Sequence, residues 1–185
     1  MPRGPRDDAS GVVHHVMARG IERGSIFRDD LDREDLLGRL DRLCPELGFC
    51  CLAWALMTNH FHLVLRSGPI RVSRLMARLG TGYALRFNQR HDRVGHLFQN
   101  RFRSRRATTD GDVVGLVLYV CRNPLEGGLV AQPDALARFE WCSVGALTGA
   151  RTSRRFESIG ETLALFDDDP TRARAKLRKS LGATE

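Results

Sequence analysis

The stretch Met57-Thr58-Asn59-His60-Phe61-His62-Leu63-Val64-Leu65 decides the fold that we expect for this chain. Its Thr-Asn pair is a two-residue turn signal between two apolar runs, residues 49–57 and 60–66, so these runs should form a β-hairpin. Side chains alternate between the two faces along a strand, and His60 and His62 therefore point the same way. Two neutral imidazoles on one face make half of a divalent-metal site.

The elements on either side of this hairpin complete an α+β pattern. Residues 12–18 are rich in β-formers and predict a first strand, and leucines at helical spacing predict a helix that ends at Gly48. Farther along we expect an amphipathic helix over about 70–90, a fourth strand over 95–106, and a helix that is capped by Asp110 or Asp112 and ends near 123–124. The order β-α-β-β-α-β is that of the ferredoxin-like split βαβ fold, an antiparallel sheet with helices on one face. Its first and third strands are central neighbours, which places the two histidines in mid-sheet.

A second pair of candidate residues lies about sixty residues after the histidines. Tyr119 and Asn123 are four positions apart in a helical pattern and so share one face. A hard divalent cation accepts an amide oxygen together with imidazoles and leaves positions for phosphate oxygens. The phenol, one turn from Asn123, is then suitably placed for in-line attack on a metal-bound phosphodiester. Each signal alone also has an ordinary explanation: an idle histidine pair, a core tyrosine, or an asparagine that ends a helix.

Another histidine pair, His14-His15, lies in the first predicted strand. Adjacent strand residues face opposite ways, so these two imidazoles cannot converge on one ion. We interpret them as structural or, at most, as a contact to DNA.

Composition indicates a basic protein of one domain. The chain has 185 residues and a formal charge of +7, and its pI is about 9.8. This balance favours a polyanionic partner.

There is no apolar run long enough for a transmembrane helix and no apolar segment at the start that would make a signal peptide. The five cysteines have no zinc-ligand spacing and fit a reducing compartment. We expect a cytoplasmic, nucleoid-associated protein without membrane contact.

Basic residues are concentrated in two segments. Residues 86–106 contain seven arginines, one acid and three phenylalanines. This mixture suits backbone tracking and base stacking on single-stranded DNA, although the phenylalanines could be core and the arginines a solvated face. The arginines that we predict to bind DNA are Arg19, Arg71, Arg74, Arg78, Arg86, Arg90, Arg101, Arg103, Arg105 and Arg106.

We divide the chain into a flexible basic arm (1–11), the main domain (12–150) and a basic C-terminal extension (151–185). The extension is either an auxiliary DNA contact or a solvated appendage.

Over roughly residues 12–147 the chain resembles a known family, the HUH single-strand DNA transposases with one catalytic tyrosine, in particular the REP-associated tyrosine transposases. The resemblance rests on several segments in the same order along the chain. They include Arg19-Gly20, residues 56–63 around the two histidines, Gly95-His96-Leu97-Phe98-Gln99-Asn100-Arg101-Phe102, Tyr119-Val120-Cys121-Arg122-Asn123-Pro124, and Trp141-Cys142-Ser143. Asn100 and Glu126 depart from the family pattern, which usually has glycine and a basic residue there.

The resemblance implies an HUH endonuclease fold, a Mg²⁺ or Mn²⁺ ion, and cleavage of single-stranded DNA beside imperfect palindromic hairpins. His60 and His62 are then metal ligands, Asn123 is the third ligand, and Tyr119 is the nucleophile of a 5′-phosphotyrosine intermediate that leads to strand transfer. Two alternatives remain: a nickase of the replication-initiator or relaxase type, and a non-catalytic, domesticated protein that binds DNA hairpins. The sequence leaves open whether the protein is a monomer or a homodimer.

Overall fold

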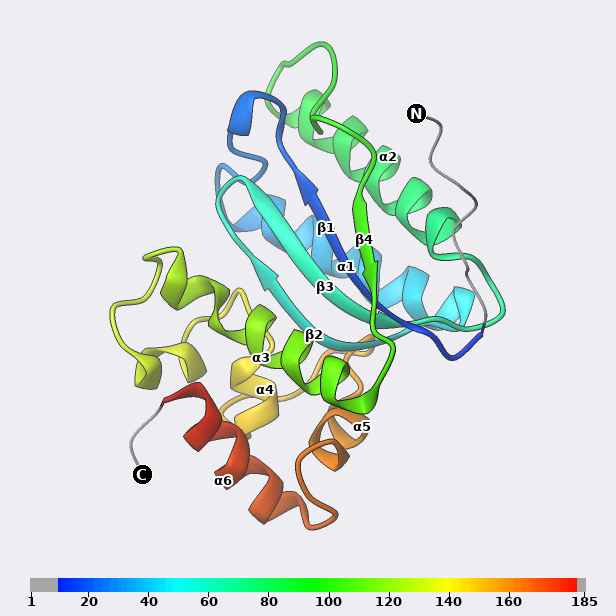
Figure 1. The fold of residues 1–185 in the computed structure, drawn as a ribbon. Helices are drawn as coiled ribbons and strands as arrows, with labels where there is room; N and C mark the ends of the chain where they lie inside the picture. Colours follow the sequence, from blue (N-terminus) through cyan, green and yellow to red (C-terminus); the bar gives the residue numbers. More distant parts are fainter. Residues whose placement is uncertain (1–9, 183–185) are drawn as a thin grey trace.

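The computed structural model describes residues 10–182, so the predicted arm over residues 1–11 lies outside the described part except for its last two residues. A four-stranded antiparallel sheet forms the centre of the molecule (Figure 1). In the order β2-β3-β1-β4, its strands are β2 (Cys50–Leu56), β3 (His60–Arg66), β1 (Val13–Arg19) and β4 (Arg103–Arg106). The predicted α+β class is confirmed, and β1 and β3 are the two central strands.

Helices cover both faces of this sheet, so the prediction of helices on one face only is wrong (Figure 1). On one face lie the two crossover helices of the split βαβ unit, α1 (Asp30–Leu47) and α2 (Val72–Arg90). On the other face lies α3 (Asp110–Glu126), which packs against β2 and β3. Shorter elements complete the chain: η1 (Ile21–Arg23), η2 (Pro133–Ala137), α4 (Val144–Thr148), α5 (Ile159–Ala164) and α6 (Pro170–Leu181).

Alternation along the strands separates the core into two clusters. Val16 and Leu63 belong to the cluster under α1 and α2, whereas Val13 and Val64 belong to the cluster under α3. The register pairs Met17 with His62. Cross-strand partners share a face, so Met17, His62 and every second residue beside them face α3.

The ends of the helices follow local chemistry. Asp29 caps α1 by accepting a hydrogen bond from the backbone N–H of Asp32 (3.1 Å), and Gly48 ends the helix with φ +73°. α3 begins one residue earlier than predicted: Thr109 is its N-cap and Asp112 completes a capping box. α3 also continues past the predicted end near residues 123–124 and includes Pro124 in its last turn.

The fourth strand is shorter than predicted. Only residues 103–106 pair as a strand with β1, and residues 95–102 form a loop. Gly95 turns the chain with φ +92°, and the loop then makes single backbone bonds to the end of β1, such as Gln99 N–H to the Arg19 carbonyl (2.9 Å). The apolar residues of this loop pack towards α2 instead of continuing a ladder.

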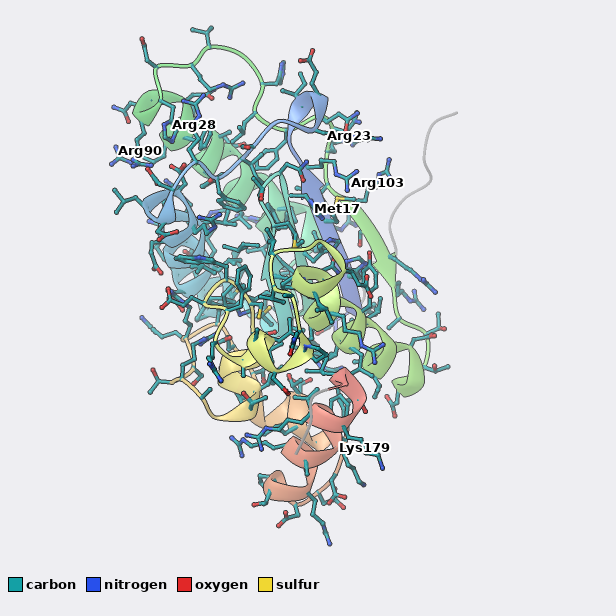
Figure 2. The ribbon with its side chains drawn as sticks, turned by 90° about the vertical axis from the view of Figure 1, so that its left-hand side faces the viewer. Met17, Arg23, Arg28, Arg90, Arg103 and Lys179 are labelled. Atoms are coloured by element: carbon teal, nitrogen blue, oxygen red, sulfur yellow. The ribbon has the colours of Figure 1, made fainter. Side chains whose placement is uncertain are left out.

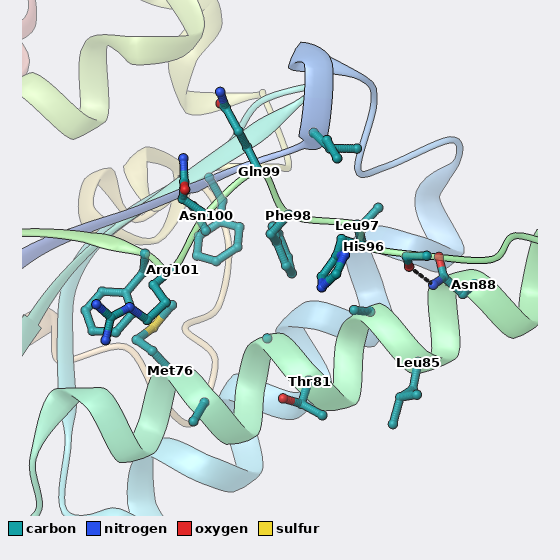
Figure 3. A pocket seen from close by; sticks show the side chains of 18 of the residues that line it. Met76, Thr81, Leu85, Asn88, His96, Leu97, Phe98, Gln99, Asn100 and Arg101 are labelled. Carbon is teal, nitrogen blue, oxygen red and sulfur yellow. Dashed lines mark hydrogen bonds between the residues drawn. The ribbon is translucent and has the colours of Figure 1, made fainter.

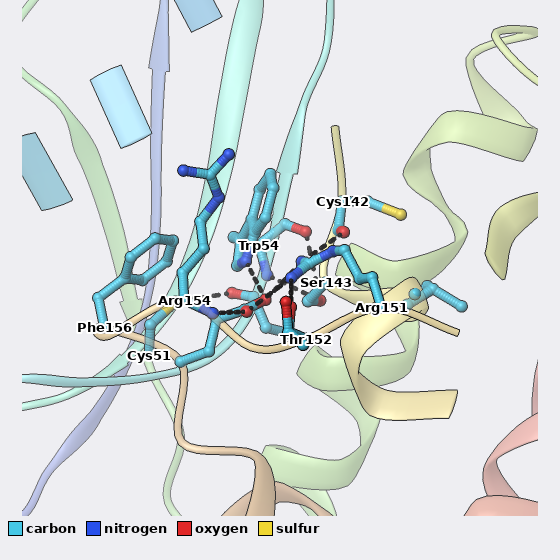
Figure 4. Close-up of polar contacts among 12 residues, drawn as sticks. Cys51, Trp54, Cys142, Ser143, Arg151, Thr152, Arg154 and Phe156 are labelled. Atoms are coloured by element: carbon cyan, nitrogen blue, oxygen red, sulfur yellow. Dashed lines mark hydrogen bonds and ion pairs between the residues drawn. The ribbon is translucent and has the colours of Figure 1, made fainter. Parts of the chain in front are cut away.

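The segment after residue 150 packs on the sheet (Figure 4). The Glu157 carboxylate is buried, accepts a hydrogen bond from Trp54 Nε1 (2.7 Å), and pairs with both terminal nitrogens of Arg151. The Cys51 backbone bonds to residues on either side of Glu157, which covers the outer edge of β2. Leu163 and Leu177 enter the same cluster as α3. Residues 151–182 are therefore built into the fold and do not form a solvated appendage.

Candidate active site

Strand β3 and helix α3 bring His60, His62 and Tyr119 to one place. His60 and His62 lie on β3 and face α3, with ring centroids 4.9 Å apart. Tyr119 projects from α3 onto this face, and its ring meets that of His62 edge-on with centroids 5.8 Å apart. The Tyr119 side chain is 44% exposed, although most of its apolar neighbours on α3 are buried. The phenol is therefore accessible to solvent and also lies against the His62 ring of β3.

His15 is the residue of this site that sequence reasoning missed. Its ring stacks on His62 with centroids 5.1 Å apart and meets Tyr119 edge-on at 5.6 Å. The interpretation of His15 as structural or as a DNA contact is therefore incomplete. The missing information was the register, because the pairing of Met17 with His62 places His15 diagonally beside His62. His14 faces the other way and its Nδ1 lies 3.3 Å from the Ser104 hydroxyl.

Hydrogen bonds determine which imidazole nitrogens are available. The Asn59 amide donates from Nδ2 to the Arg23 carbonyl, so its oxygen accepts from Nδ1 of His60 (2.7 Å). His60 Nε2 is then the atom with a lone pair. Nδ1 of His62 lies 2.8 Å from Nε2 of His15, and Nε2 of His62 is buried and has no hydrogen-bond partner among residues 10–182. If His62 donates from Nδ1 to His15, its unpartnered Nε2 also carries a lone pair, which is the form that a metal ion takes.

The electrostatic environment keeps these imidazoles neutral. Burial lowers the pKa of His60 to about 4, and the Arg19 guanidinium adds to this effect. Burial lowers the pKa of His62 to about 3, with smaller contributions from His15, His60 and Arg19. The pKa of His15 is lowered by burial and then by Arg105. At neutral pH all three rings therefore have lone pairs for hydrogen bonds or metal coordination.

Asn123 lies one helical turn beyond Tyr119 and is buried, with 7% of its surface exposed. Its amide nitrogen donates to the carbonyl of Tyr119 (2.8 Å), a bond within α3. This bond uses the nitrogen, and the amide oxygen is the atom that a hard cation would bind. Tyr119 and Asn123 share one face of α3 as predicted, but within the described residues Asn123 makes no hydrogen bond to His60 or His62.

The donor set around the histidines fits a hard divalent cation only in part. Two neutral imidazoles, one with an unpartnered buried nitrogen, suit Mn²⁺ or Mg²⁺ when oxygen ligands complete the shell. Within residues 10–182, no three His, Cys, Asp or Glu side chains converge as a metal-binding group. The remaining ligands would have to be the Asn123 amide, water, and phosphate oxygens of the substrate.

The predicted DNA-binding arginines fall into two groups. Arg19 pairs across the strands with His60, and its Nε is buried without a hydrogen-bond partner in the described residues. Arg103 and Arg105 alternate on β4 and face the same side, and Figure 2 shows Arg103 beside Met17. Arg106 is exposed at the end of β4, and Arg101 lies in the loop that leads into β4. Arg19, Arg103 and Arg105 lie on the histidine face of the sheet, and Arg106 lines a groove with His15 and Tyr119. Arg101 instead lines a cavity between α2 and the loop before β4.

The second group lies on α2, across the sheet from Tyr119. Arg78 forms an exposed ion pair with Glu46 of α1. Arg90, labelled in Figure 2, pairs with Asp29 and Asp32 and so joins the end of α2 to the start of α1. Arg71, Arg74 and Arg86 are exposed on α2. Their contact with DNA stays a prediction.

The interleaved phenylalanines belong mainly to the core. Phe87 is fully buried, which agrees with the alternative that the phenylalanines belong to the core and leaves this ring unable to stack on bases. Phe98 and Phe102 are partly buried and pack on the cluster under α1 and α2. A cavity of about 740 Å³ lies between α2 and this loop, with Leu85 and Phe98 among its apolar walls (Figure 3). It lies on the face opposite Tyr119 and is separate from the site described above.

A family comparison agrees with this geometry. The sequence profile of the family described as "Transposase IS200 like" matches residues 8–120, more than half of the chain. The chain belongs to the IS200-like transposases. The matched range of this transposase includes His15, both histidines of β3 and Tyr119, and ends before Asn123. No curated protein gives a significant sequence match.

The transposase is also similar to solved structures. One is a REP-associated tyrosine transposase bound to a REP hairpin, with a TM-score of 0.62, 16% identity, and coverage of 82% of this chain and 87% of that one. At this identity the similarity concerns the fold, and it confirms the predicted architecture. A second is a proposed transposase from Deinococcus radiodurans, with a TM-score of 0.44, 17% identity, and coverage of 65% and 95%. Within residues 10–182, no helix is long and apolar enough to cross a membrane.

Proposed function

We propose that this transposase cleaves single-stranded DNA beside a palindromic hairpin and transfers the strand through a 5′-phosphotyrosine intermediate. The observation that carries the proposal is the contact of the half-exposed Tyr119 ring with His62 and His15. A solvent-accessible phenol beside two neutral imidazoles is the arrangement that a phosphodiester attack requires. The hairpin is inferred from the complex of the structural relative.

The residues of the site have separate roles in this proposal. The Tyr119 oxygen attacks the scissile phosphorus, loses its proton, and forms a bond to phosphorus, while the bond to the 3′-oxygen breaks and a free 3′-OH leaves. A second 3′-OH then reverses these steps on a new strand. A bound Mg²⁺ or Mn²⁺ would supply Lewis-acid stabilisation of the charge on phosphate oxygens. His60 and His62 would hold this ion through Nε2, with Asn123 as a further ligand.

The basic residues near the site would hold the substrate. Arg19, Arg103 and Arg105 lie on the same face as the histidines and would bind the phosphates next to the scissile bond. The Tyr119 ring contacts the His62 ring of its own chain, so we propose that Tyr119 acts within its own subunit.

The test uses a hairpin oligonucleotide with an unpaired flank, labelled at either end, and Mn²⁺ or Mg²⁺. We expect a covalent protein–DNA adduct that carries the 3′-labelled fragment and resists denaturation. EDTA or the double variant His60→Ala, His62→Ala should remove the adduct but weaken binding less, because arginine–phosphate contacts supply most of the affinity.

Binding of the hairpin without any adduct in the presence of metal would instead favour the alternative, a non-catalytic protein that binds DNA hairpins. An adduct that persists in the double variant under chelation would show that the histidines do not form a metal site.

A further inference from the structure

A groove leads along the sheet to Tyr119. It has a volume of about 430 Å³ and lies between β4 and the first half of α3. His15, Arg105 and Arg106 line it from the strands, and Gly111, Gly115 and Tyr119 line it from the helix. This volume lies within the range of roughly 300–1,000 Å³ that is typical of small-ligand sites.

Packing does not require a glycine at either of the two glycine positions in this groove. Gly111, Gly115 and Tyr119 are spaced by four residues and so follow one face of α3. A Cβ on Gly115 would have no heavy atom within 4 Å, and one on Gly111 would meet only the Thr109 hydroxyl oxygen, at 3.7 Å. Glycine in a helix interior is destabilising relative to alanine. What the glycines provide is open space beside β4.

The other end of α3 is closed. A Cβ on Gly127 would lie 2.3 Å from Cε of Met57, in the loop between β2 and β3. Val120 and Asn123 are buried there. An extended ligand at Tyr119 can therefore follow α3 only towards its N-terminus.

The groove has a positive wall that suits phosphate. Arg105 is exposed, lies opposite His15 in the strand register, and is near enough to lower the pKa of that ring. Asp112 also lines the groove, but its carboxylate is engaged at the helix terminus, where Oδ2 accepts from the Thr108 hydroxyl (2.6 Å) and from backbone N–H groups. Leu116 adds an apolar surface against which a base can pack.

From these observations we propose that the groove holds the unpaired DNA strand adjoining the phosphate that Tyr119 attacks, and that Gly115 keeps it open. Phosphates would lie on Arg105 and Arg106, with a base against Leu116 and the glycines. This proposal rests on the proposed function, because it assumes that Tyr119 is the point of attack. It adds the path of the substrate and a residue that determines access.

The test compares Gly115→Leu with the matched variant Gly38→Leu. Gly38 is also an exposed glycine in a helix interior, on α1, and its Cβ would likewise have no heavy atom within 4 Å. Both variants should fold and melt no lower than the parent. Gly115→Leu should slow adduct formation at least tenfold while hairpin affinity changes less than twofold, and Gly38→Leu should change neither. Equal adduct rates in both variants and the parent would overturn the proposal.

A second measurement does not depend on cleavage. The Tyr119→Phe protein is irradiated with hairpin oligonucleotides that carry 4-thiothymidine in the unpaired flank, and the crosslinked peptides are mapped. We expect crosslinks within residues 103–119, reduced by Gly115→Leu in the same background. Crosslinks confined to α2 would place the strand on the other face and overturn the proposal. Crosslinks within 103–119 without an adduct in the parent would support the groove while the proposed function fails.

Discussion

At the scale of single residues, the two tyrosines of the chain show how surroundings decide chemistry. Tyr119 is half exposed and contacts His15 and His62. Tyr83 is 1% exposed, donates its hydroxyl to the Ile26 carbonyl, and has its pKa raised by burial. A buried phenol with a raised pKa cannot reach a phosphodiester or ionise near neutral pH. Of the two tyrosines, only Tyr119, the exposed phenol beside the imidazoles, is a candidate for the nucleophile.

This contrast predicts opposite effects for two matched substitutions. Tyr119→Phe should abolish the covalent adduct and leave the free energy of unfolding nearly unchanged. Tyr83→Phe should keep the adduct and lower the free energy of unfolding by about 1–3 kcal/mol, because it leaves a buried carbonyl unsatisfied. Denaturing gels with labelled DNA and urea unfolding measure the two effects. An adduct formed by the Tyr119→Phe protein would reassign the nucleophile.

His15 supports a second prediction at this scale. Because its Nε2 lies 2.8 Å from Nδ1 of His62, we expect it to hold His62 in the tautomer whose Nε2 binds metal. His15→Phe removes the acceptor and should weaken Mn²⁺ binding about 10–100-fold, the usual effect of losing such a supporting hydrogen bond. His15→Gln keeps an acceptor and should recover much of the affinity. The free Mn²⁺ signal in electron paramagnetic resonance gives the affinity without any cleavage. Equal Mn²⁺ affinities of the His15→Phe and His15→Gln proteins would show that His15 does not have this role.

At the scale of elements, the capping box of α3 predicts a pH dependence of stability. The Thr108 hydroxyl, followed by backbone N–H groups, lowers the pKa of Asp112 to about 2. A carboxylate whose pKa falls on folding stabilises the protein above its unfolded pKa, near 4, and this contribution is lost as the pH falls through about 2.

The Asp112→Asn variant should therefore be less stable than the parent at pH 6, and the difference should shrink between pH 4 and pH 2. Thr109→Val is the control, because it removes the hydroxyl half of the same box and should cost about 1 kcal/mol at every pH. Urea unfolding at a series of pH values measures both. A difference for Asp112→Asn that stays constant down to pH 2 would contradict the prediction.

Elements with local signals were predictable from the sequence, and those that depend on distant contacts were not. The β2–β3 hairpin and the end of α1 at Gly48 follow from a turn pair and a C-terminal glycine. The length of β4 depends on pairing with β1, far away in sequence, so the sequence alone does not show that residues 95–102 form a loop. His15 was missed for the same reason: topology made β1 and β3 neighbours, but only the register places His15 beside His62.

At the scale of the whole molecule, the chain after residue 150 holds the β2 side of the sheet together. The Glu157 side chain is 1% exposed and accepts bonds from Trp54, Arg151 and the backbone of Arg154. Its removal leaves buried donors without partners. Because Leu163 and Leu177 also belong to the core under α3, we expect this segment to be required for folding.

Glu157→Ala should lower the free energy of unfolding by about 3–5 kcal/mol, the usual cost of breaking a buried ion pair. Glu46→Ala removes an exposed pair with Arg78 and should change stability little. A chain that ends at residue 150 should fail to give a cooperative unfolding transition. Circular dichroism during urea titration tests all three proteins, and a cooperative transition of the shortened chain would contradict the expected role of the segment.

The separation of the core by the sheet has a consequence for the evolution of this chain. Along β1 and β3, residues that pack on α1 and α2 alternate with residues that face α3 and the reactive centre. Substitutions on the α1–α2 side can therefore accumulate without altering the geometry of the chemical groups. The exposed arginines of α2, whose contact with DNA is a prediction, lie on the side of the sheet that can vary in this way.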